Sequence, residues 1–140
     1  MTDRETEFRE FAGARMESLR VLAYLTCGDW RIAEDVVLAT LAKLYGRWHR
    51  MDNHEAYART AVVRAAVDAT RRWWWRRPDL PVRQRAALVL HFLEGLSVRQ
   101  TAVILGFPES TVQDYTSPGP AAFRRMLDER TEERHATRTA

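Results

Sequence analysis

The sequence predicts an all-α protein built in two parts, and three observations support this prediction. Apolar residues recur at spacings of three and four through much of the chain, which is the spacing of one face of an α-helix. Short segments containing Gly, Pro, Asp or Asn interrupt that pattern, as expected where helices end. No segment shows the strict alternation of a β-strand. We therefore expect a three-helix N-terminal domain over residues 1–77, a small helix-turn-helix domain over 80–127, and a polar tail over 128–140.

The first two expected helices meet at the segment TCGDW. The first carries an apolar stripe that includes Phe8, Phe11 and Leu22, and Gly28 can stop it while Asp29 can cap the next helix. We place Glu34 and Asp35 in the first turn of the second helix, where the helix dipole favours acidic groups. That helix has the clearest stripe in the chain, made of Ala33, Val36, Val37, Thr40, Leu41, Leu44, Tyr45 and Trp48.

A third helix is expected over residues 53–76. Asp52 and Glu55, three residues apart, resemble a capping box in which Asp52 is the cap. One face of this helix is expected to be basic, with Arg59, Arg64, Arg71 and Arg72. The inner face is predicted to consist of Tyr57, Ala61, Val62, Ala65, Ala69 and Trp73.

Residues 80–127 are expected to form three short helices. Pro78 and Pro81 end the preceding helix, and the segment SVRQ is a capping box that opens VRQTAVILG. A short turn containing glycine leads from there to STVQDYT, which gives the order helix, turn, helix.

The charge is distributed unevenly along the chain. Residues 1–40 hold five basic and eight acidic residues, a net charge of −3, whereas residues 41–90 have a net charge of +7 and residues 91–140 of −1. The basic block includes RRWWWRR, and Arg next to Trp is suited to phosphate contact combined with base stacking. The alternative is a solvated helix end whose tryptophans fill the core.

Several classes of protein find no support in the sequence. A single cysteine, Cys27, excludes an intramolecular disulfide, and four scattered histidines offer no metal-ligand pair. There are no paired carboxylates in an apolar setting, no glycine-rich phosphate loop and no nucleophile beside a base. We therefore expect no enzyme activity, no cofactor and no metal. The charged N-terminus and the lack of a long apolar run predict a cytoplasmic protein without a membrane partner.

Three segments in order resemble the extracytoplasmic-function (ECF) type of bacterial RNA polymerase sigma factor. AYLTCGDWRIAEDVVLATLAKLYGRW is similar to the family's core-binding segment, and NHEAYARTAVVRAAVDATRRWWWRR is similar to its promoter-reading helix. LPVRQRAALVLHFLEGLSVRQTAVILGFPESTV resembles its C-terminal helix-turn-helix domain. The resemblance implies a protein that binds core polymerase and directs promoter recognition and transcription initiation. It also allows for an anti-sigma protein as a partner.

The resemblance implies roles for particular residues. It implies that the clamp of the polymerase core is faced by Glu34, Asp35, Val36, Leu38, Thr40 and Leu41. It implies that minus-ten promoter DNA is contacted by Arg50, Asn53, His54, Arg59, Arg64, Arg71, Arg72 and Trp74, with Asn53 and His54 reading the edge of a flipped base. In the helix-turn-helix, it places Ser110, Thr111, Gln113 and Asp114 at the major groove.

Two departures from the family favour a second reading, a sigma-derived regulator or interaction module that does not initiate transcription. The four residues between Arg77 and Val82 span at most about 18 Å when extended, whereas the minus-ten and minus-thirty-five elements lie about 25 base pairs or ~85 Å apart. In addition, Asp114 and the Pro118-Gly119-Pro120 segment stand where a basic continuation of the recognition helix is expected. Proline inside a helix costs about 3 kcal/mol or more. We therefore expect weak DNA binding by the isolated C-terminal part.

Overall fold

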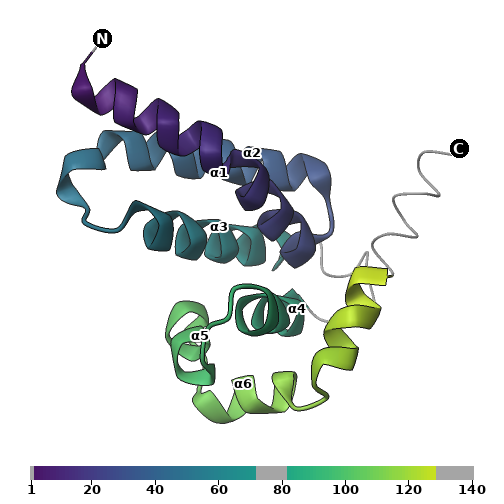
Figure 1. The fold of residues 1–140 in the computed structure, drawn as a ribbon. Coiled ribbons are helices and arrows are strands. Elements are labelled where there is room, and N and C mark those ends of the chain that lie inside the picture. Colours follow the sequence, from purple (N-terminus) through teal and green to yellow (C-terminus); the bar gives the residue numbers. More distant parts are fainter. Residues whose placement is uncertain (1, 72–81, 129–140) are drawn as a thin grey trace, which may run out of the picture. The chain divides into compact units, whose positions relative to one another are not determined.

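The computed structural model describes residues 2–71 and 82–128, and within these ranges the regular structure is helical, without a strand (Figure 1). The predicted all-α class is confirmed. The chain divides into two compact units, Met1–Ala69 and Thr70–Ala140. Arg72, Trp73, Trp74 and Trp75, together with Pro78 and Pro81, lie outside the described residues.

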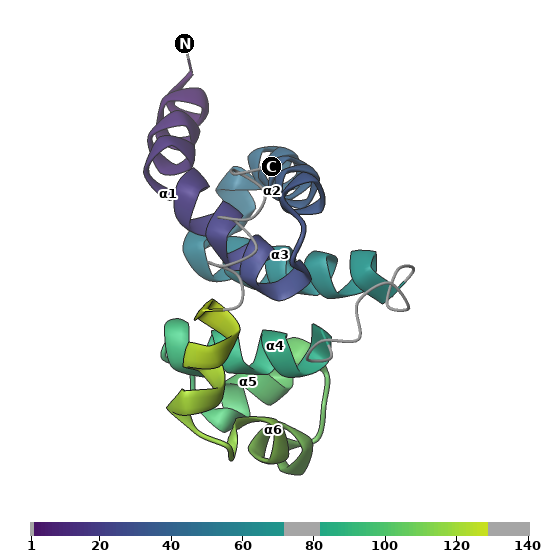
Figure 2. The same ribbon diagram turned by 90° about the vertical axis from the view of Figure 1, so that its right-hand side faces the viewer.

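The first unit begins with a pair of long helices, α1 (Asp3–Cys27) and α2 (Trp30–Gly46). Gly28 ends α1 in the left-handed region at φ 76°, and its backbone N–H donates to the Tyr24 carbonyl. The Asp29 carboxylate then accepts hydrogen bonds from two backbone N–H groups of α2. A connection of two residues forces α2 to run back along α1 (Figures 1 and 2). The predicted roles of Gly28 and Asp29 are confirmed.

Helix α3 (His54–Arg71) follows a 3-10 turn, Trp48–Arg50. Its cap is Asn53, because the Asn53 Oδ1 accepts a hydrogen bond from the Ala56 backbone N–H at 3.0 Å. The prediction of Asp52 as the cap is wrong by one residue. Both side chains are suitable caps, so the sequence alone does not choose between two adjacent candidates.

The buried face of α3 differs from the predicted one. The predicted residues Tyr57, Ala61, Ala65 and Ala69 are only partly buried, while Val62 is fully buried as expected. The buried face is rotated by about one residue, which corresponds to ~100° on a helix. Alanines occur in both stripes, so the apolar spacing did not separate them. Besides Val62, the core residues of α3 are Ala58, Val63, Ala66, Val67 and Thr70.

An aromatic cluster around Trp48 joins α1 to the start of α3. The Trp48 ring stacks on His54 at a centroid distance of 3.5 Å and meets Phe8 and Phe11 edge-on at 5.8 and 5.6 Å. Its Nε1 donates a 2.7 Å hydrogen bond to the Glu7 carboxylate. Trp48 therefore links α1 to the start of α3 by both packing and a hydrogen bond to a charged acceptor.

The second unit consists of short helices. α4 (Val82–Leu88) continues into a π-helical stretch, Val89–Leu93, where the Glu94 backbone N–H donates to the Val89 carbonyl at 3.1 Å. Then follow α5 (Val98–Leu105), α6 (Glu109–Thr116) and a further helix over residues 120–128. The predicted capping box of α5 is confirmed, since Ser97 and Gln100 exchange hydrogen bonds through their side chains and backbone N–H groups.

The last helix corrects the prediction of three helices over 80–127. Gly119 adopts φ 83°, and Pro120 is the first residue of the new helix, a position where proline is favoured because its missing N–H is not needed. Ala122 and Met126 of this helix are buried. Pro118 and Pro120 therefore separate two helices and do not interrupt one, so the expected cost of an interior proline does not arise.

None of the described helices is long and apolar enough to cross a membrane. Over the same residues, no group of three or more His, Cys, Asp or Glu side chains is arranged to hold a metal ion.

Candidate functional site

The second unit contains a compact helix-turn-helix formed by α5 and α6. Gly106 ends α5 at φ 72°, and both it and Phe107 donate backbone hydrogen bonds to the Ala102 carbonyl. Pro108 is extended and opens α6. Buried Ala87, Ala102 and Val112 hold α4, α5 and α6 together, with Val98, Leu105, Phe107 and Tyr115 packed around them.

Helix α6 has a buried face and an exposed face of opposite character. Val112 and Thr116 are buried, and the Thr116 hydroxyl donates to the Val112 carbonyl within the same helix. The exposed face includes Ser110, Gln113 and Asp114, whereas Thr111 is partly buried. Three of the four residues predicted at the major groove are therefore solvent-exposed. Because α6 carries Glu109 and Asp114 but no Lys or Arg, its side chains have a net charge of −2.

Two arginines next to α6 are not among the residues predicted from the sequence to bind DNA. Arg83 of α4 places its guanidinium 5.1 Å from the centroid of the Phe107 ring, at the turn before α6. Arg99 of α5 is 85% exposed and lies 3.9 Å from the Glu109 carboxylate at the start of α6. Both arginines belong to other helices, α4 and α5. Their position beside the N-terminal end of α6 follows only from the packing of the three helices.

The exposed face of α2 is the candidate polymerase-binding surface. Glu34, Asp35 and Leu38 are exposed, and Leu38 is a large apolar residue with 59% of its surface exposed. Val36, Thr40 and Leu41 are instead buried, each less than a tenth exposed. These three belong to the apolar stripe that packs into the unit, and their contact with the clamp stays a prediction. Glu34 and Asp35 also lie one turn further along than predicted, since α2 begins at Trp30.

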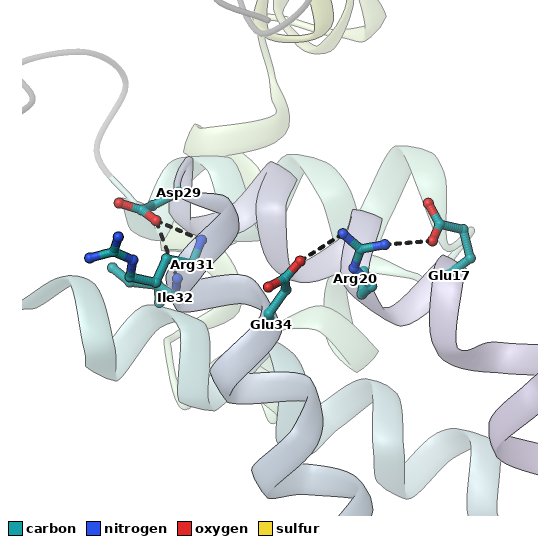
Figure 3. Close-up of polar contacts among 6 residues, drawn as sticks. All are labelled: Glu17, Arg20, Asp29, Arg31, Ile32 and Glu34. Atoms are coloured by element: carbon teal, nitrogen blue, oxygen red, sulfur yellow. Dashed lines mark hydrogen bonds and ion pairs between the residues drawn. The ribbon is translucent and has the colours of Figure 1, made fainter. Parts of the chain in front are cut away.

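Arg20 of α1 contacts one edge of the exposed face of α2. Arg20 donates to Glu17 of α1 and to Glu34 of α2, both at 2.9 Å (Figure 3). Its guanidinium also lies 5.4 Å from the centroid of the Trp30 ring, and Trp30 in turn stacks on Tyr24 at 3.9 Å. The same view shows the Asp29 cap, at 2.8 and 3.2 Å from two backbone N–H groups. Glu34 is therefore oriented by a neighbouring helix.

The residues expected at a flipped base have structural contacts of their own. Besides stacking on Trp48, His54 forms a 2.8 Å hydrogen bond between its Nε2 and the Trp48 carbonyl. Asn53 uses its Oδ1 as the cap of α3. Arg50 is exposed at the end of the 3-10 turn. Helix packing and capping thus account for His54 and Asn53 in this structure, and base reading by them stays a prediction.

The predicted basic track of α3 is only partly described. Arg64 is exposed and Arg59 is half-buried. They are five positions apart, so they lie about 140° from each other around the helix. Arg71 ends the described part of α3, while Arg72 and Trp74 lie beyond it.

Comparison with protein families identifies one segment. Residues 79–117 match the model of sigma-70, region 4. In this part the protein is sigma-factor-like. The match covers α4, α5 and α6, which are the helices that build the helix-turn-helix core. No curated protein matches the chain.

Proposed function

We propose that this protein is a cytoplasmic, sigma-like transcription protein of the ECF type that binds core RNA polymerase through α2 and contacts promoter DNA. The observation that carries this proposal is the sigma-70 region 4 match, which coincides with a helix-turn-helix whose recognition helix presents a polar face. The N-terminal domain, proposed over residues 1–77, supplies the polymerase contact, and residues 80–127 supply a DNA contact.

The polymerase contact is proposed to centre on Leu38. A side chain of this size that is 59% exposed on a regular helix is suited to a partner's apolar pocket. The carboxylates of Glu34 and Asp35 lie one turn before it on the same helix, and such charges orient a partner more than they add affinity. This surface does not include Val36, Thr40 or Leu41, which stabilise the unit from within.

We propose that two groups of residues share the DNA contact, namely the arginines next to α6 and the side chains of α6 itself. Phosphate neutralisation supplies most of the affinity of such proteins, and α6 has no cation of its own. Arg83 and Arg99 from the neighbouring helices are therefore the proposed phosphate contacts beside α6. Arg64, Arg71 and Arg72 of the predicted basic track are the proposed phosphate contacts of the promoter-reading helix.

The test is a pull-down with core polymerase that compares Leu38→Asp with Val103→Asp. Val103 is a 69% exposed residue of α5, so its variant makes the same chemical change at an exposed site of the other unit. We expect Leu38→Asp to weaken core binding about tenfold or more, as at an interface hot spot, and Val103→Asp to leave it unchanged. Circular dichroism should show both variants folded. Wild-type protein that fails to bind core would contradict the polymerase contact altogether.

A second candidate function is the sigma-derived regulator that binds polymerase without initiating transcription. The acidic α6 and the short joint before Val82 favour it. Runoff transcription separates the two candidates, using one template with a minus-ten element alone and one with both elements. Transcripts from either template support initiation, and stable core binding without transcripts supports the regulator.

A further inference from the structure

The exposed face of α6 carries one continuous row of polar side chains. Ser110, Gln113, Asp114 and Ser117 follow one another at spacings of three, one and three, and all four are exposed. Residues at positions i, i+3, i+4 and i+7 share one face of a helix. Ser117 is the C-terminal cap residue, and its backbone N–H donates to the Gln113 carbonyl. We call these four residues the α6 polar row.

Gln113 and Asp114 are the two members of the row with hydrogen-bonding groups long enough to identify a base. Among the described residues, neither side chain has a hydrogen-bond or ion-pair partner, while their backbone carbonyls accept bonds from Ser117 and Thr116. The backbone below them is therefore fixed by the helix, and the side chains extend from a rigid support with their polar atoms available.

The orientation of the row is set by packing on the opposite side of α6. Val112 is fully buried and Tyr115 packs at the edge of the same core. The side-chain amide of Gln84 in α4 also donates to the Tyr115 carbonyl at 3.4 Å. Since these contacts fix the helix on its inner side, the polar row keeps a constant position relative to Arg83 and Arg99.

The geometry points to base selection by these two residues, a proposal that rests on the proposed DNA-binding function. Gln matches adenine, because its amide donates to N7 and accepts from the N6 amino group at the same time. A carboxylate can only accept, and in the major groove the N4 amino group of cytosine donates without an accompanying acceptor on the same base. We therefore propose that Gln113 selects adenine and Asp114 selects cytosine at two nearby base pairs of duplex DNA.

The charge of Asp114 makes its selection stringent. The carboxylate repels the phosphates on every sequence. Adenine and cytosine both offer a donor in the major groove, but the cytosine donor has no acceptor beside it on the same base that would repel the carboxylate, so cytosine compensates best for its desolvation. Asp114 thus lowers affinity for all duplexes and lowers it least for those with cytosine in register. An acidic recognition helix in this arrangement favours discrimination over tight binding.

The experiment is selection of the full chain against a random duplex library at low salt, followed by affinity measurements on the selected duplex. We expect enrichment of an adenine and a cytosine at fixed spacing. Gln113→Ala should abolish the adenine preference alone, and Asp114→Ala the cytosine preference alone, each by about five- to 150-fold in discrimination. Asp114→Asn should shift the second preference from cytosine toward adenine and strengthen binding to unselected duplex.

Asp3→Asn is the matched control, because it removes the same charge from an exposed position of α1 that belongs to neither proposed binding surface. It should leave the selected sequence unchanged. A different enriched sequence, or one unaffected by the Gln113 and Asp114 variants, overturns the assignment of these residues and leaves DNA binding intact. Absence of any salt-dependent duplex binding by the full chain overturns the proposed DNA contact and this inference together.

Discussion

The two units of the protein reach a helical fold by different physical means. The first uses helices of 25, 17 and 18 residues, an aromatic cluster and ion pairs between helices. The second uses α-helices of seven to nine residues around a small core that includes Ala87, Ala102 and Val112. Isolated helices shorter than about 12–15 residues are marginal in water. The second unit therefore depends more heavily on its caps and on each buried side chain.

The largest expected effect comes from deleting the same core side chain in each unit. Leu44→Ala in α2 and Leu88→Ala in α4 both empty fully buried sites, and each should cost about 2–5 kcal/mol of unfolding free energy. Because the second unit has the smaller core, we expect Leu88→Ala to unfold it while Leu44→Ala leaves the first unit folded but weakened. Hydrogen exchange read by peptide assigns the loss to one unit. If both variants leave the two units equally protected from hydrogen exchange, the second unit is not the more sensitive one.

The aromatic cluster offers the next largest effect. Trp48→Phe keeps a ring against His54 but removes the Nε1 donor to Glu7. A hydrogen bond to a charged group contributes about 1.5–3 kcal/mol, so chemical denaturation should show a loss of this size in the first unit. Glu7→Gln is the matched control, since it keeps an acceptor without the charge and should cost less. If Glu7→Gln lowers the unfolding free energy as much as Trp48→Phe does, the charge of Glu7 accounts for the loss and the smaller size of the Phe ring does not.

Replacing one helix N-cap by alanine in each unit compares the two units by the same kind of change. Asp29→Ala removes the cap of α2, and Ser97→Ala removes half of the capping box of α5. Each should cost about 1 kcal/mol. We expect the Ser97 variant to lose more helix content by circular dichroism. The reason is that α5, with eight residues, is less stable without its cap than α2, with 17. A larger helix loss in the Asp29 variant would reverse the argument about helix length.

The smallest expected effect is that of the Arg20–Glu34 ion pair. Their side chains are 33% and 54% exposed, so a double-mutant cycle with alanine should give about 0.2–1 kcal/mol. Added salt should reduce this coupling, because exposed charges are screened. The Arg15–Glu55 pair is the comparison, with a longer distance of 3.2 Å and greater exposure of Arg15, 47%. Its coupling should be the weaker of the two.

Local chemistry was the predictable part of this fold. Gly28, Asp29 and Ser97 act through hydrogen bonds within a few residues, so their roles follow from neighbouring sequence. The buried face of α3 was not predictable, since alanines occupy two adjacent stripes. Pro120 was misread as a breaker because the same residue type both ends and begins helices.

The candidate site was less predictable than the fold for a related reason. The family resemblance assigned Val36, Thr40 and Leu41 to a partner surface, although their own spacing places them in the core. Arg83 and Arg99 were overlooked because their place beside α6 depends on how α4, α5 and α6 pack. Contacts between distant residues decide such positions, and a single sequence does not record them.

The π-helical stretch Val89–Leu93 lets the helix that begins with α4 hold one extra residue. A π-helical turn closes with an i→i+5 hydrogen bond and an α-helical turn with an i→i+4 bond, so the π turn takes up one residue more. Deleting one residue there would let the helix continue as an ordinary α-helix, and the side chains before and after the deletion would keep their directions. The second unit can therefore lose one residue at this point of its sequence without a change in the helix faces on either side.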